Sequence, residues 1–392
     1  MASSTQNRLS EYLPLLAFVA AWTLQLVYFL GYDSRLFFSY GFSIASLILL
    51  AVASYAVGFL GFRLLPLANF FAGQANARRA LHPRTVKLLL LMTVALSSGI
   101  IAMNIVIPLA RGISLSGARE IALEDWENGG VLPRILSILT NVTIAFSLMA
   151  IIDQIDIRGK FPILLVALFA LLTVAAYSRA HLLLGLSVIS TKWISQSKYR
   201  VAYIFIIFVM FAALFSILSV IASVGSADRN AGLEGVFNSL EVYTFGGVAG
   251  FEFYYNTGFP QYNSLLTVPR FIYSIIPGLG NLPPSYFPFI DTVPPINVFS
   301  ALYPPYHDFG KYGLIIFFFI YGALSSVTAV LFQRRRQRYL CLLSGFFLYA
   351  ALMSPFDDQF IRGLTILILM ITGAAVYALL YRLIRNGLVL QD

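Results

Sequence analysis

Ten long apolar runs lie along this 392-residue chain and constrain its fold more than any other feature. A helix needs about 20 mainly apolar residues to cross the hydrocarbon core of a bilayer. Within lipid, backbone N–H and C=O groups must pair internally, so such runs form helices. We therefore predict an all-α, polytopic integral membrane protein with about ten transmembrane helices, near residues 12–30, 37–61, 86–110, 132–152, 161–177, 182–194, 201–224, 314–332, 339–353 and 364–381.

The composition agrees with this fold class. Only 11% of the residues are charged, whereas a soluble domain carries about 25%. A net charge of +9 would suggest nucleic-acid binding in a soluble protein. In a membrane protein, basic residues gather in the cytoplasmic loops, so we expect no nucleic-acid partner. The lone cysteine, Cys341, cannot form an intrachain disulfide. The N-terminal residues 1–10 carry one basic residue and are followed by a long apolar run without an A-x-A cleavage pattern, so we expect an uncleaved first span.

The loop charges predict the orientation. With the N-terminus inside, 17 Lys and Arg residues fall on the cytoplasmic side and nine fall outside. The positive-inside rule therefore favours a multi-pass protein with both termini in the cytoplasm. The two long polar loops, 111–131 and 225–313, then lie on the outer side. We treat 1–392 as one transmembrane domain that contains 225–313 as a large periplasmic loop. Apolar patches at 236–255 and 265–276 predict half-helices within it.

The segment 297–313 is the most unusual part of that loop. It carries His307 and Asp308 side by side, just before the span at 314–332 begins. Ionisable groups at membrane depth are costly and usually functional. A neutral histidine or a partly buried carboxylate can act as a general base near neutral pH. We therefore predict that His307 or Asp308 is catalytic, with an N-terminal cap of the next helix as the structural alternative for Asp308.

Proline and glycine in the same segment predict a special backbone. Pro304 and Pro305 remove two backbone donors, so we expect an ordered irregular turn there rather than a helix. Gly310 and Gly313 permit a positive φ or a close approach of two backbones.

Arg179 and His181 should lie at the tip of a short helical hairpin. Only 31 residues separate Lys160 from Lys192, which supply about 46 Å of helical rise, whereas two membrane crossings need about 60 Å. The tip should therefore lie below the outer membrane interface. A guanidinium there needs an anionic ligand or a carboxylate. We favour an anionic ligand over an arginine that extends to lipid headgroups.

Three more arginines are candidate anion ligands. Arg111 and Arg119 open the first outer loop, where a short helix with Arg nearby would suit phosphate. Arg119 could equally pair with acidic neighbours such as Glu120. Arg270 follows Pro269 in an apolar stretch and is either a ligand or an interfacial anchor.

For several other ionisable residues we predict ion pairing or leave the role open. Asp357 and Asp358 are expected to pair with Arg362 rather than to bind a cation. Glu241 and Glu252 are bases or ion-pair partners, with neither role preferred. The three histidines have no metal-ligand spacing, and no nucleotide-binding motif is present. We therefore expect no metal site and no cofactor.

Arginines beside a base, on the outer face of a helical bundle, suit one kind of chemistry. The guanidinium pairs with two phosphate oxygens at once and stays charged at any working pH. Fixed positive charge can stabilise a leaving pyrophosphate. The pattern therefore favours glycosyl transfer from a polyprenyl-pyrophosphate donor in the membrane.

The sequence also resembles a family, the bacterial O-antigen or oligosaccharide repeat unit polymerases of the Wzy type. The resemblance rests on Asn297-Val-Phe-Ser-Ala, on Tyr306-His-Asp-Phe-Gly with Gly313 opening a span, on Tyr177-Ser-Arg-Ala-His-Leu-Leu-Leu and on the Arg111/Arg119 loop. Length, number of spans and the dominant outer loop are similar too.

The resemblance implies a GT-C-like inner-membrane glycosyltransferase that polymerises undecaprenyl-pyrophosphate-linked repeat units at the periplasmic face. It implies membrane lipid and a chain-length regulator protein as partners, and Asn297 and Tyr306 as further substrate-binding residues. Two alternatives stay open. One is an O-antigen ligase, which transfers to the lipid A core. The other is a non-enzymatic flippase or exporter of lipid-linked oligosaccharide, which needs no base beside its arginines.

Overall fold

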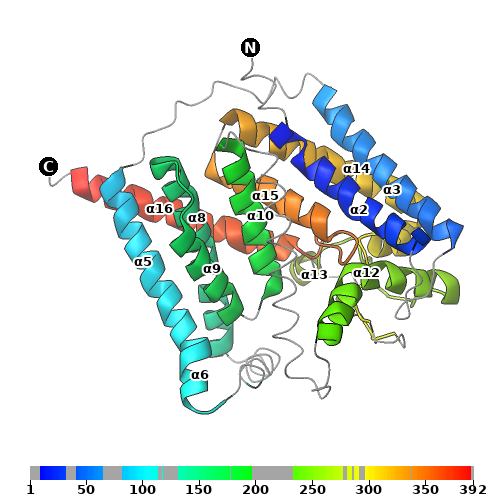
Figure 1. Cartoon of the computed structure of the whole chain (residues 1–392), viewed down its shortest axis with the longest axis horizontal. Coiled ribbons are helices and arrows are strands. Elements are labelled where there is room, and N and C mark those ends of the chain that lie inside the picture. The colour runs from blue at the N-terminus through cyan, green and yellow to red at the C-terminus, as the bar shows by residue number, and fades with distance from the viewer. Residues whose placement is uncertain are drawn as a thin grey trace. The chain divides into compact units, whose positions relative to one another are not determined.

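The computed structural model describes residues 9–31, 41–64, 82–113, 117, 131–176, 178–196, 233–276, 280–284, 287–290, 296–335 and 337–389 (Figure 1). Within these ranges the secondary structure is helical and contains no β-strand; a single antiparallel bridge joins Ile290 and Ile296. The predicted all-α class is confirmed for this part of the chain.

Helices occupy all the predicted apolar ranges except 201–224, which lies outside the described residues. They follow a short 3₁₀ turn, η1 (Leu9–Glu11), and are α2 (Leu13–Gly31), α3 (Phe42–Leu64), α5 (Pro83–Ile101) continued by the π-turn η2 (Ala102–Val106) and α6 (Ile107–Ala110), α8 (Val131–Arg158), α9 (Ile163–Ala175), α10 (Arg179–Gln196), α14 (Tyr303–Arg335), α15 (Arg338–Met353) and α16 (Leu364–Val389).

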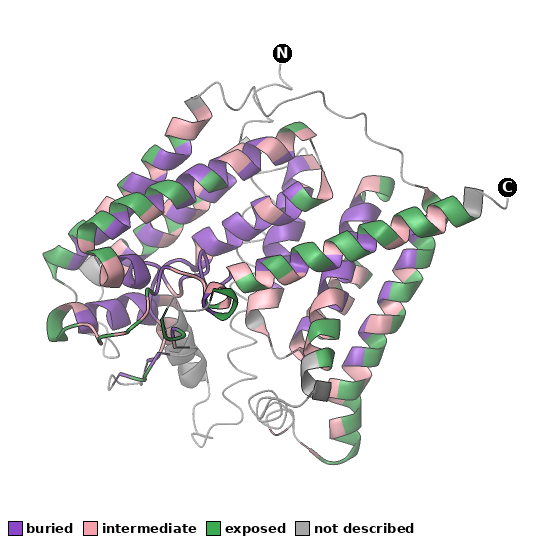
Figure 2. Ribbon diagram, turned by 180° about the vertical axis from the view of Figure 1, so that it is seen from behind, coloured by how far each residue is buried: buried purple, intermediate pink, exposed green. Residues whose placement is uncertain are grey.

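Five of the described helices are long and apolar enough to cross a membrane: residues 42–63, 83–110, 135–158, 303–335 and 364–387. Three more helices are apolar but shorter, at 13–28, 163–175 and 338–353. Exposed residues recur along these helices (Figure 2), and they include large apolar ones such as Ile316 and Ile320 on α14 and Leu379 and Leu383 on α16. Apolar surface of this extent suits a lipid environment. The chain is an α-helical membrane protein.

The chain forms two compact units, each assembled from separate stretches of sequence. The first contains residues 1–75, 231–336 and 346–365, and the second contains 76–230, 337–345 and 366–392. The single transmembrane domain over 1–392 stays a prediction, and each unit is described by itself.

In the first unit, α3 packs on α14 through two glycines. A Cβ atom at Gly58 would lie 2.1 Å from the carbonyl oxygen of Phe319, and one at Gly322 would lie 2.1 Å from that of Tyr55. The two backbones can therefore approach this closely only because both residues lack a side chain. Beside this contact the Tyr55 hydroxyl donates to Ser325 Oγ over 2.8 Å, which pairs a buried polar group.

The large loop contributes two helices to the first unit, α12 (Leu233–Thr257) and the short α13 (Arg270–Ile275). They coincide with the two predicted apolar patches, although α13 begins only after Pro269. Gly250 of α12 allows close packing, since a Cβ there would lie 2.8 Å from the Phe299 ring. The amide of Ser300 donates to the Gly247 carbonyl over 2.9 Å. These contacts hold the 297–303 segment against α12.

In the second unit, ionisable side chains are paired inside the helical bundle. Asp153 of α8 forms an ion pair with Arg338, whose Nε lies 2.7 Å from Asp153 Oδ1. Its Oδ2 accepts from the Tyr377 hydroxyl of α16 over 3.0 Å. Lys192 of α10 lies 2.8 Å from a carboxylate oxygen of Asp156. Charges taken out of water in this way need partners, and these pairs fix the helices of this unit to one another.

Candidate functional site

The candidate site begins where α14 starts. Pro304 and Pro305 lie buried in the first turn of that helix, so the predicted irregular turn at these prolines is wrong. Proline suits this position because the first helical residues have no intrahelical partner for their N–H groups. The helix is interrupted later, at Gly310, which has φ 58° and ψ −144°. A Cβ at Gly313 would lie 2.0 Å from the Pro305 carbonyl oxygen, which confirms the expected close approach.

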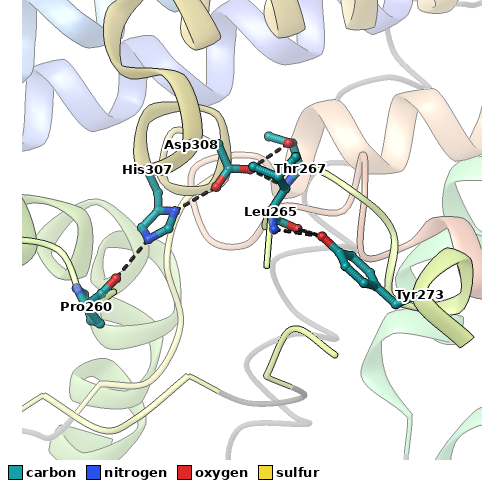
Figure 3. Close-up of polar contacts among 6 residues, drawn as sticks. All are labelled: Pro260, Leu265, Thr267, Tyr273, His307 and Asp308. Carbon is teal, nitrogen blue, oxygen red and sulfur yellow. Dashed lines mark hydrogen bonds and ion pairs between the residues drawn. The ribbon is translucent and has the colours of Figure 1, made fainter. Parts of the chain in front are cut away.

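The turn before Gly310 carries a hydrogen-bond network between α14 and the preceding loop (Figure 3). His307 Nδ1 lies 2.7 Å from Asp308 Oδ1, and His307 Nε2 lies 2.9 Å from the Pro260 carbonyl oxygen. Asp308 Oδ2 accepts from the Thr267 amide over 2.8 Å and from the Thr267 hydroxyl over 2.7 Å. We call these four residues the His307–Asp308 network.

The partners in this network limit where its protons can be. The Pro260 carbonyl can only accept, so His307 Nε2 must carry a hydrogen and donate it. The remaining proton lies between Nδ1 and Asp308 Oδ1, on one atom or the other. His307 therefore has no free nitrogen lone pair. The Asp308 side chain is 1% exposed, and its Oδ2 already accepts two hydrogen bonds. In this arrangement the network holds α14 against the loop at Pro260 and Thr267, and His307 and Asp308 have little capacity to accept another proton.

A second pair of bonds holds the same loop. The Leu265 amide donates to the Tyr273 hydroxyl over 2.8 Å, and that hydroxyl donates to the Leu265 carbonyl over 3.2 Å. Tyr273 belongs to α13, so the 260–268 segment is held by α14 at Pro260 and Thr267 and by α13 at Leu265 (Figure 3). Arg270, the first residue of α13, is exposed, and so is available to an external anion.

Aromatic rings surround the network. Phe259 contacts the rings of Tyr303, Tyr306 and His307, with centroids 5.5 Å, 5.6 Å and 6.1 Å away. Tyr262 lies 5.4 Å from His307. Phe259 and Tyr306 are half-buried, so part of each ring is accessible. A surface of aromatic rings with hydroxyl groups suits the apolar faces and polar edges of sugar rings.

Two carboxylates of α12, Glu241 and Glu252, bond to the N-terminal part of the unit. Glu241 accepts from the Tyr28 hydroxyl, and Glu252 Oε1 accepts from the Gly41 amide over 3.3 Å. Glu252 is 6% exposed, and this burial raises its pKa to about 7. A carboxyl with such a pKa exchanges its proton near neutral pH, which a general base requires.

Asp357 and Asp358 occupy different environments although they are adjacent. Asp357 Oδ1 lies 2.9 Å from Arg362 Nη1, which confirms the predicted pairing for this residue. Asp358 makes no such ion pair among the described residues; its Oδ1 instead accepts from the amides of Phe360 and Ile361. The Arg362 guanidinium also lies over the Phe287 ring, 5.3 Å from its centroid.

The remaining predicted residues lie elsewhere. Arg179 is the first residue of α10 in the second unit, where His181 Nδ1 lies 2.5 Å from Ser178 Oγ. The helix before this tip, α9, has 13 residues, or about 20 Å, in agreement with a short hairpin. Arg111 is exposed at the end of α6, whereas Arg119 lies outside the described residues.

The structure thus brings together His307, Asp308 and Tyr306, with half-buried Asn297 in the same unit. Sequence reasoning missed Thr267 and Pro260. A proline carbonyl and a threonine in a loop carry no periodic signal, so only the folded chain identifies them. The density of aromatic residues in 251–262 could have indicated a site in this loop, because a long outer loop is expected to be polar.

Comparison of the chain with protein-family models, curated proteins and solved structures gives no match.

Proposed function

We propose that this protein is an inner-membrane glycosyltransferase that polymerises undecaprenyl-pyrophosphate-linked oligosaccharide repeat units at the periplasmic face. The observation that carries the proposal is the His307–Asp308 network, which joins the start of α14 to the aromatic 259–268 segment. It orders the same residues on which the resemblance to Wzy-type polymerases rests. The proposal includes ten spans, cytoplasmic termini and a GT-C-like architecture.

The proposed reaction transfers a glycan between two lipid carriers. An acceptor sugar hydroxyl attacks the anomeric carbon of the donor glycan and forms the new glycosidic bond. The bond from that carbon to the pyrophosphate oxygen breaks, and undecaprenyl pyrophosphate leaves with the electron pair. The acceptor proton passes to a base. Arg179, with Arg111 or Arg119, and with Arg270 as a further candidate, would stabilise the leaving pyrophosphate by paired guanidinium contacts.

The roles of the outer-loop residues follow from their surroundings. Tyr306 and Asn297 would contact the sugars. Asp308 and His307 would position the acceptor segment, because their polar atoms are already paired with each other and with the loop. Asp308 stays a candidate base, and Glu252 is a second one, since its raised pKa of about 7 suits proton transfer.

The test is reconstitution of the purified full chain in vesicles that contain undecaprenyl-pyrophosphate-linked repeat units. We expect a ladder of polymers on gels. Transfer to lipid A core without a ladder would identify a ligase, and movement of the intact lipid across the bilayer without a new glycosidic bond would identify a flippase. Either outcome contradicts polymerisation.

Two substitutions assign the base in the same assay. An asparagine at 308 can still accept from Thr267 and donate to a neutral His307, so Asp308→Asn should insert and fold. If Asp308 is the base, polymerisation falls about 10²- to 10⁴-fold. A normal ladder from Asp308→Asn and none from Glu252→Gln would instead assign the base to Glu252.

A further inference from the structure

The loop between α15 and α16, residues 354–363, contains a carboxylate oxygen without a hydrogen-bond partner. Asp358 is 1% exposed. Its Oδ1 accepts from the Phe360 amide over 3.1 Å and from the Ile361 amide over 3.3 Å. Its Oδ2 is fully buried and has no hydrogen-bond partner within the described part of the chain. A buried group of this kind requires an explanation.

The charges nearby do not compensate Asp358. The cation of the loop, Arg362, is paired with Asp357. The titratable and charged groups that face this loop from its own residues and from the helices packed on it are Asp357, Arg362, Tyr321 of α14, Tyr349 of α15 and Tyr55 of α3, whose ring lies 6.3 Å from Phe360. Among the described residues, these helices contribute hydroxyl groups and no cation to the surroundings of Asp358. Glu241 and Glu252 of α12 bond to Tyr28 and Gly41 instead.

An ionised carboxylate this deeply buried is costly unless a cation or a proton neutralises it. No third His, Cys, Asp or Glu among the described residues joins Asp357 and Asp358 in a group able to hold a metal ion. A proton is the simpler occupant. Burial first, and then the like charge of Asp357, raises the pKa of Asp358 to about 7, so the proton binds in an accessible pH range.

We propose that Asp358 is a proton-binding site, and that a proton on its Oδ2 keeps the 354–363 loop packed against α12 and the 300–301 segment. This inference goes beyond the proposed glycosyl transfer and does not depend on it.

Three contacts hold this loop against neighbouring parts of the first unit. The Ser354 carbonyl accepts from the Ala301 amide over 2.7 Å. The carbonyl oxygens of Pro355 and Phe356 lie 2.5 Å and 2.3 Å from where a Cβ of Gly247 would be. Trp22 Nε1 donates to Ser354 Oγ over 2.9 Å. Release of the proton leaves a charge that must be hydrated, and the contacts of the loop then loosen.

The direction of the pH dependence follows from the two pKa values. The packed loop binds the proton with a pKa of about 7, whereas a hydrated Asp has a value of 3.8. Packing is therefore favoured fully at low pH, weakens as the pH rises through this window, and is weakest above pH 7.

Trp22 provides the probe, because its indole bonds to the loop. The chain has three tryptophans, so Trp126→Phe with Trp193→Phe leaves Trp22 alone. We expect its fluorescence in the detergent-solubilised full chain to change with a midpoint near pH 7. Adding Asp358→Asn to this double variant should abolish the transition, and adding Glu252→Gln should leave it intact. The proposal is overturned if the double variant shows no transition, if the transition survives Asp358→Asn, or if it disappears with Glu252→Gln.

Two further substitutions test the site with Asp358 unchanged. Asp357→Asn removes a like charge and should move the midpoint about one pH unit lower, whereas Arg362→Gln removes an opposite charge and should move it higher by a similar amount. Both residues lie at the more exposed edge of the loop, with side chains 13% and 32% exposed. Unchanged midpoints in both variants, or shifts in the reverse directions, contradict the proposal.

Discussion

His307 is hydrogen-bonded at both ring nitrogens, and this distinguishes it from a histidine poised to take a proton. Pro260 occupies one nitrogen and Asp308 the other. The His307–Asp308 pair therefore holds α14 to the loop rather than acting as a free acid–base group. The packing of the 259–268 segment should depend on the Asp308 carboxylate, which accepts two hydrogen bonds from Thr267.

Thr267→Val tests that dependence. Valine keeps the side-chain shape and the backbone N–H but removes the hydroxyl that donates to Asp308 Oδ2 over 2.7 Å. Loss of a hydrogen bond to a charged group should cost about 1.5–3 kcal/mol in the free energy of unfolding, measured by thermal melting in detergent. Thr267→Ser keeps the hydroxyl and is the matched control. Equal melting temperatures for the valine and serine variants would show that the hydroxyl bond contributes nothing.

At the scale of helices, the contact of α3 with α14 shows how small residues set the distance between two spans. Gly58 and Gly322 each face a backbone carbonyl of the opposite helix. Without a hydrophobic effect between helices in lipid, such close packing is a main source of association. Because α14 also carries His307 and Asp308, the position of α3 indirectly supports the site.

Alanine substitutions should separate packing from helix propensity. Gly58→Ala and Gly322→Ala each place a Cβ 2.1 Å from a carbonyl oxygen, so the helices must move apart; overpacking typically costs about 1–3 kcal/mol. Gly61→Ala, on the same helix α3, meets no atom within 4 Å and should be neutral or stabilising by up to about 1 kcal/mol. Thermal melting of the three variants measures this. Equal stability of Gly58→Ala and Gly61→Ala would exclude the tight contact.

At the scale of the whole molecule, the charge pattern makes a prediction about orientation. With 17 basic residues assigned inside and nine outside, the 225–313 loop should face the periplasm. A reporter enzyme that works only in the periplasm should be active when it is fused after Gly225. A reporter that works only in the cytoplasm should be active when it is fused after Gln333. Reporter activities in whole cells give the result. The reverse pattern would place the His307–Asp308 network on the cytoplasmic side and rule out the proposed reaction.

The sequence alone predicted the class and the positions of the described helices, because apolar runs bounded by polar loops leave the backbone no other way to satisfy its hydrogen bonds in lipid. It also predicted the special backbone at Gly310, since only glycine readily adopts a positive φ. It misjudged Pro304 and Pro305, because proline disrupts a helix interior but is favoured in a first turn.

Tertiary structure decided which ionisable groups are paired. Pro260 and Thr267 are 47 and 41 residues from their partners in the network, and no local pattern connects them. Asp357 and Asp358 are neighbours of the same type, yet one pairs with Arg362 and the other is buried in the loop near Tyr321 of α14. Side-chain partners depend on which surfaces the packed helices bring together, whereas helix formation depends on the local run of residues.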